Sequence, residues 1–188
     1  MKIKEYVEFL NLVEKLKCNT RHSWTSSGRH ESVAEHSWRI TLMAMLIEDE
    51  FPEIDITKLM KMCVIHDFGE ALTGDIPAFL KTSEDEKLED DAVETILSKL
   101  PENYKNEFTH LFTEMNKRES LEAKLLKALD NMEAIVSHNE ADISSWLPNE
   151  YHDNLTYGAD KVTFSAWTQS LKDYLNQESI KKINESKL

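Results

Sequence analysis

Apolar side chains recur every three or four positions along most of this chain, which is the spacing of amphipathic helices. The first such stripe predicts a helix over residues 3–17. Ser32 with Glu35 three residues later matches a capping box and predicts a second helix that runs to about Asp49. Residues 18–32 between them show no regular pattern, so we expect a long loop, of a kind that often has a functional role.

Further apolar stripes predict helices over residues 57–70, 101–117, 119–139 and 162–175. An acidic run at residues 84–91 favours the start of another helix, because carboxylates stabilise a first helical turn. The pattern therefore predicts an all-α fold. We expect one domain over residues 1–176, followed by a frayed polar tail over residues 177–188.

The composition agrees with one helical domain: 40% of the 188 residues are hydrophobic, and there are only four Gly and four Pro. The net charge of −13 argues against a nucleic-acid polymer as partner, although a metal and local cations could still attract a small anion. Two isolated cysteines, Cys18 and Cys63, favour a reducing, cytoplasmic setting. We expect no membrane association, since neither a transmembrane run nor a signal peptide is recognisable.

Four polar residues fall on inward faces of three predicted helices, namely His36, His66, Asp67 and Asp130. Burying them unpaired would cost several kcal/mol, and a bound metal ion is a good candidate to compensate them. Each also has a plainer explanation: a hydrogen-bonded core histidine, a helix cap at the His-Asp pair, and an ion pair between Lys127 and Asp130. Two imidazoles and two carboxylates suit a six-coordinate divalent ion with two open positions, whereas structural zinc more typically binds cysteines.

Such an ion would have positions for a water molecule and for a phosphate oxygen. A divalent ion lowers the pKa of bound water from about 16 to about 7 in the best cases. A nearby carboxylate could then act as a general acid or base. Glu70, one helical turn after His66, is placed for that role.

These residues lie within longer segments that match a known family. The matching segments cover about residues 5–140 and read Arg21-His22-Ser23-Trp24, Glu31-Ser32-Val33-Ala34-Glu35-His36-Ser37, His66-Asp67-Phe68-Gly69-Glu70-Ala71, Thr73-Gly74-Asp75-Ile76-Pro77, Lys81 and Lys127-Ala128-Leu129-Asp130-Asn131-Met132-Glu133-Ala134. In this order they resemble the HD-domain metal-dependent phosphohydrolases. The resemblance is closer to the 5′-deoxynucleotidase branch, of the YfbR and HD-domain-containing protein 2 type.

The resemblance implies an HD-domain helical bundle around one metal site. Its ligands would be His36, His66, Asp67 and Asp130. They would hold one divalent ion among Mn, Co, Fe, Ni, Cu, Zn and Mg, whose identity the sequence leaves open. The reaction would be hydrolysis of deoxyribonucleoside 5′-monophosphates by a metal-activated water. The family also suggests a homodimer.

The resemblance also implies roles around the substrate. Glu70 would handle the proton on the attacking water or the leaving group, and Asp75 would orient the water or the sugar. Arg21 and Lys81 would face the phosphate. Trp24 would lie over the sugar, where a bulky ring leaves no room for a 2′-hydroxyl.

Several alternatives remain. Arg29 is a rival for the phosphate contact. Guanosine-tetraphosphate hydrolases of this family have a Glu-Asp pair after the His-Asp, and residues 68–71 do not supply it. Two-metal cyclic-nucleotide phosphodiesterases need more histidines before the last aspartate, where only His110 lies. A catalytically silent nucleotide-binding protein would not need Glu70 and Asp75.

Overall fold

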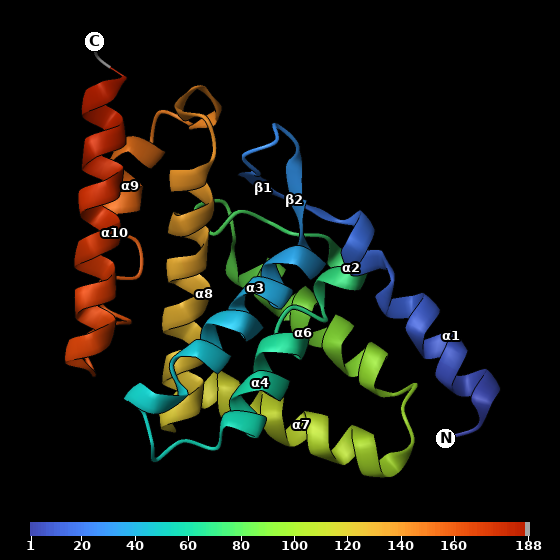
Figure 1. Ribbon diagram of the computed structural model, residues 1–188. Coiled ribbons are helices and arrows are strands. Elements are labelled where there is room, and N and C mark those ends of the chain that lie inside the picture. The colour runs from blue at the N-terminus through green and yellow to red at the C-terminus, as the bar shows by residue number, and fades with distance from the viewer. Residues whose placement is uncertain (187–188) are drawn as a thin grey trace.

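The computed structural model describes residues 1–186, which form a helical fold with one small hairpin (Figure 1). The elements in chain order are α1 (Ile3–Val13), α2 (Lys15–Cys18), β1 (Thr20–Trp24), β2 (His30–Ser32), α3 (Val33–Leu46), η1 (Glu48–Glu50), α4 (Ile56–Ile65), α5 (Glu70–Thr73), α6 (Ser83–Leu97), α7 (Glu102–Lys117), α8 (Leu121–Glu140), η2 (Ile143–Ser145), α9 (Glu150–Thr156) and α10 (Ala166–Glu185). The all-α class is confirmed.

The core is built around α8, which packs against α10 on one side and against α3 and α4 on the other (Figure 1). Leu125 and Leu129 of α8 belong to a large apolar cluster shared with α3 and α4. Met132 and Ile135 belong to a second cluster, which Leu175 of α10 joins. A helix that is apolar on most sides must be covered on most sides, and α8 is therefore the central helix of the fold.

The start of α3 follows the predicted capping box. The Ser32 hydroxyl accepts a hydrogen bond from the Glu35 amide (3.2 Å), and the Glu35 carboxylate accepts one from the Ser32 amide (2.9 Å). His36 and Ile40 then point into the core, and neither exposes any surface. The regular helix ends at Leu46, and the short helix η1 covers the remaining predicted residues.

The segment predicted to be a loop instead forms the hairpin of β1 and β2. The strands are antiparallel, with Thr20 opposite Ser32 and Trp24 opposite His30, and their register is irregular in between. Strand β1 packs against α8, which lies far from it in the sequence. This packing brings the residues of β1 to the C-terminal half of α8, where Ser23 lies 3.3 Å from His138.

The helix predicted over residues 57–70 is interrupted. Helix α4 ends at Ile65, α5 begins at Glu70, and residues 66–69 form a turn. Gly69 in this turn lies directly against α6, because a Cβ atom there would be 2.7 Å from Glu89 Cγ and 2.9 Å from the Glu89 carbonyl oxygen. The contact requires glycine, and it places the His-Asp pair in a turn rather than within a helix.

The last helix extends well beyond the predicted end. Residues 177–185 belong to α10 and are not frayed, and the helix crosses residue 176 without a break. The buried Ser179 hydroxyl donates to Asn139 Oδ1 (2.8 Å), and Lys182 donates to the Asn139 carbonyl (3.0 Å). These tertiary hydrogen bonds stabilise a polar helical segment that an apolar stripe does not indicate. Residues 187–188 of the predicted tail lie outside the described part.

Candidate metal and substrate site

The structure brings together the four residues predicted to bind a metal. They come from α3, the turn after α4, and α8. His36 Nε2 lies 3.2 Å from Asp130 Oδ1 and 3.8 Å from Asp67 Oδ2, and His66 Nε2 lies 3.1 Å from Asp67 Oδ2. His36, His66 and Asp67 offer ligand atoms that all lie within 4.8 Å of one another. The spacing is close enough for one ion to contact these side chains together.

The hydrogen bonding of His66 directs its second ring nitrogen to the cluster. Its Nδ1 donates to the carbonyl oxygen of Cys63 (2.9 Å), which leaves a lone pair on Nε2. That Nε2 is buried and has no hydrogen-bond partner. A buried polar atom without a partner costs free energy, and a divalent ion would satisfy it.

The buried carboxylate of Glu133, which is not one of the four predicted ligands, orients His36. Nδ1 of His36 donates to Glu133, which exposes no surface. Glu133 also accepts a hydrogen bond from Ser137 (2.8 Å) and lies 3.4 Å from Arg39 Nε. Burial opposes ionisation, but the hydrogen bond from His36 lowers the pKa of Glu133. Such a carboxylate fixes the tautomer and the direction of a ligating histidine. The sequence analysis did not assign this role to Glu133, although Glu133 lies one helical turn after Asp130.

The ion pair offered as an alternative for Asp130 does exist. Lys127 Nζ donates to Asp130 Oδ2 (2.7 Å), whereas Oδ1 faces His36. Burial opposes ionisation, but the Lys127 ammonium brings the pKa of Asp130 well below its ordinary value. The lysine therefore leaves one oxygen of an ionised carboxylate directed at the cluster.

A cavity of about 410 Å³ opens beside the cluster, and Asp67 and Asp130 form part of its wall. Glu70 and Asp75 also line this cavity, and their catalytic roles stay predictions. Burial, together with the carboxylates of Asp67 and Asp75, raises the pKa of Glu70 to about 10. In the metal-free protein this burial favours the protonated form of Glu70, the form that can donate a proton inside the cavity.

Three cationic side chains also line the cavity: Arg21, Lys81 and Lys127. Arg21 lies at 3.8 Å from Asp75 and at 3.6 Å from Glu31, and its buried Nε has no hydrogen-bond partner. Neither carboxylate lies within hydrogen-bonding distance of the guanidinium, so these contacts are ion pairs without a hydrogen bond. Lys81 forms an ion pair with Glu89 of α6.

Two other candidates lie elsewhere. Arg29 forms an exposed ion pair with Glu35 and does not line the cavity. Trp24 is not among the residues that line this cavity, and its contact with a sugar stays a prediction. Its ring packs on His30, with centroids 4.0 Å apart, because the unpredicted hairpin places these two residues opposite each other.

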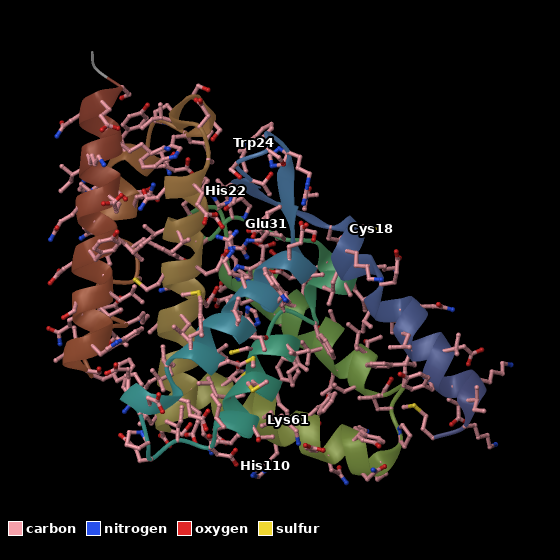
Figure 2. The ribbon with its side chains drawn as sticks, viewed as in Figure 1. Cys18, His22, Trp24, Glu31, Lys61 and His110 are labelled. Carbon is pink, nitrogen blue, oxygen red and sulfur yellow. The ribbon has the colours of Figure 1, made fainter. Side chains whose placement is uncertain are left out.

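The cavity wall also includes residues that the sequence did not single out. Figure 2 shows His22 beside α8, with Trp24 nearer the tip of the hairpin. His138, Glu150, Asn154 and Tyr157 complete this part of the wall. Apolar periodicity gives no signal for such residues, since they meet only through the tertiary fold.

Comparison with known proteins identifies the family. The model of the HD domain matches residues 13–172. This chain belongs to the HD-domain family. The human relative of this HD-domain protein, named 5′-deoxynucleotidase HDDC2, is 31% identical over 154 residues, which cover 80% of this chain and 74% of that protein. The Dictyostelium discoideum protein of the same name is 34% identical over 148 residues, covering 73% of this chain and 78% of that protein.

A solved structure supports the same fold for this HD-domain protein. The crystal structure of a protein from Magnetospirillum magnetotacticum, described as a predicted metal-dependent phosphohydrolase, superposes with a TM-score of 0.82. It covers 96% of this chain and 93% of its own, at 24% identity. Within residues 1–186, no helix is both long enough and apolar enough to span a membrane.

Proposed function

We propose that this HD-domain protein hydrolyses deoxyribonucleoside 5′-monophosphates to deoxynucleoside and phosphate. The main support is one arrangement: two histidines and two aspartates meet beside a cavity that is also lined by the buried carboxyl of Glu70 and by three cationic side chains. The relatives named as 5′-deoxynucleotidases match most of the chain. A cavity of about 410 Å³ lies within the usual range for small-molecule sites.

His36, His66, Asp67 and Asp130 would hold one divalent ion, and its identity among the first-row metals and magnesium stays open. When bound, such an ion supplies Lewis acidity to a phosphate oxygen and to a water molecule. Glu133 would keep His36 in the tautomer that a ligand needs.

The protein's own side chains would bind the phosphate and manage the proton. Arg21 and Lys81 would donate to the phosphate oxygens, and Lys127 adds positive charge to the same wall. Asp75 would keep Arg21 in place across 3.8 Å. Glu70 would pass its proton to the 5′-oxygen of the leaving deoxynucleoside as the P–O bond breaks.

A two-metal cyclic-nucleotide phosphodiesterase is less well supported. His110, the one additional histidine before Asp130 in the relevant stretch, is exposed on α7 and does not line the cavity (Figure 2). It therefore has no position from which to join the ligand cluster.

The test is phosphate release from a panel of deoxyribonucleotides, ribonucleotides, cyclic nucleotides and guanosine tetraphosphate, with added Mn²⁺ or Co²⁺. We expect release from deoxyribonucleoside monophosphates. Glu70→Gln should lower kcat at least about 100-fold, the lower range for general acid–base catalysis, without changing metal content. Glu86→Gln, an exposed change on α6, is the matched control. A metal-loaded protein that releases no phosphate from any deoxyribonucleotide would refute the proposal.

We also infer a homodimer, as the family suggests. Trp38, Leu42 and Met45 form an apolar stripe along α3, and their exposed fractions are 65%, 39% and 49%. Exposed apolar patches of this kind are typical of protein–protein contacts. Light scattering on the purified protein would show the mass of one chain if the inference is wrong.

A further inference from the structure

A second group of two histidines and a carboxylate lies in the cavity wall, outside the four-residue cluster. His22 comes from β1, His138 from the last turn of α8, and Glu150 from the start of α9. Their ligand atoms all lie within 4.8 Å of one another. We propose that His22, His138 and Glu150 form a second site for a divalent transition-metal ion such as Zn²⁺ or Co²⁺.

The distances match those of a ligand set. His22 Nε2 lies 3.0 Å from Glu150 Oε1, and His138 Nε2 lies 3.5 Å from the same oxygen. Ligands about 2.0–2.1 Å from a tetrahedral zinc ion are roughly 3.3–3.4 Å from one another. The two observed distances lie on either side of this value. The cluster of His36, His66, Asp67 and Asp130, here called the HD cluster, has nitrogen–oxygen distances in the same range, from 3.1 to 3.8 Å.

Glu150 presents a buried oxygen whose near neighbours are the two imidazoles. Its Oε2 accepts a hydrogen bond from the Leu147 amide (2.7 Å), whereas Oε1 is buried without a hydrogen-bond partner. Because Oε1 is shielded from the cavity, a substrate base cannot contact it directly. A small ion between the two imidazoles and this oxygen can. His66 Nε2 shows the same signature in the HD cluster.

His138 is held in the orientation that a metal ligand needs. Its Nδ1 lies 2.8 Å from Asn154 Oδ1 and donates to it, so that Nε2 carries a lone pair towards Glu150. A lone pair that faces a carboxylate oxygen is repulsive unless a cation or a proton lies between them. The Ser23 hydroxyl, 3.3 Å from Nε2, can donate to this lone pair when no ion is bound. Lys172 donates to the backbone carbonyl oxygen of Asn154 (2.8 Å) and so holds the backbone of that residue.

An ion at this site would link three segments that are distant in the sequence. It would tie the hairpin to α8 and α9. With three protein ligands, one coordination position would stay open on the side of the cavity, where the His22 side chain is 25% exposed. The ion would also add positive charge to the wall that receives an anionic substrate. The competing arrangement is a metal-free cluster in which a proton lies between each imidazole and Glu150.

Metal counting on the full-length protein separates these two arrangements. The protein is stripped with a chelator, loaded with Zn²⁺ or Co²⁺, desalted, and measured by mass spectrometry of the metal. We expect two equivalents per chain in the wild type and one in Glu150→Gln. Asp130→Asn should also hold one, and the double variant none. Asp153→Asn changes another carboxylate of α9 that lines the cavity but does not contact either histidine, so it should keep two.

His22→Gln is the second test variant, because His22 lies on the hairpin and its loss leaves the buried core intact. It should also hold one equivalent and lose part of the visible Co²⁺ absorption, and circular dichroism of the metal-free variants checks their folding. A wild type that holds one equivalent would overturn the proposal, as would folded Glu150→Gln and His22→Gln variants that both hold two. Because the count does not require turnover, it stands apart from the test of the nucleotidase activity.

Discussion

The carboxylate of Glu133 gives the sharpest test of the metal site, because it contacts a ligand without being one. We consider Glu133→Gln, which keeps the size of the side chain and an oxygen that can accept from His36 Nδ1, but removes the negative charge. The change should weaken metal binding at the HD cluster while the fold persists. Glu133 is fully buried and its carboxylate is shared among His36, Ser137 and Arg39, so water cannot replace the lost charge.

The size of the effect follows from the position of the carboxylate behind a ligand. Loss of such a partner typically weakens metal affinity by about 10- to 100-fold. This corresponds to roughly 1.4–2.7 kcal/mol of binding free energy. The upper part of the range is expected here, because the hydrogen bond between His36 and Glu133 lies wholly inside the protein.

The assay is competition with a chelator for Mn²⁺ or Co²⁺, measured at one pH for Glu133→Gln and for a control variant. Glu140→Gln is the matched control: it is the same change on the same helix, it contacts the same Arg39 (2.7 Å), and it does not touch His36. Glu140→Gln should bind metal as the wild type does. Equal affinities for Glu133→Gln and Glu140→Gln would show that the buried carboxylate does not support His36 as a ligand.

Two further predictions concern stability. Lys172 is 3% exposed, and burial lowers its pKa from 10.5 to about 8. Between these values the unfolded chain binds more protons than the folded one, so the free energy of unfolding should rise with pH by up to about 3 kcal/mol. Urea titrations at pH 7 and pH 10 should show this rise in the wild type and not in Lys172→Met. The same change in the free energy of unfolding between the two pH values in both proteins would contradict the prediction. Leu129→Ala, at a fully buried position of α8, should cost about 2–5 kcal/mol in the same assay, and a loss below about 1 kcal/mol would mean that the core is loosely packed there.

The sequence predicted those features that depend on local pattern. Helix α3 has its capping box at Ser32, and α8 has apolar residues at helical spacing, so both were recognisable from neighbouring residues. The four residues of the HD cluster were recognisable because their order and flanking blocks match a family. The structure then brought His36 and Asp130 within 3.2 Å of each other.

Features that depend on distant contacts were not predictable. Helix α6 crosses the turn at residues 66–69 too closely for any side chain at Gly69, and nothing in the apolar stripe before it signals that crossing. The strands of the hairpin are short and irregular in register, so they lack the alternation that indicates a strand. The packing of Trp24 on His30 was not predictable for the same reason, since that neighbour is set by the strand opposite.

The cavity described above joins two parts of the chain that can change separately. The four clustered residues lie on α3, α8 and the turn after α4, whereas Glu150, Asn154 and Tyr157 come from the segment around α9. Substitutions in that segment can change the shape of the cavity while the four clustered residues stay the same. Over evolutionary time, HD-domain proteins built in this way can acquire new substrates by altering a few residues around α9 alone.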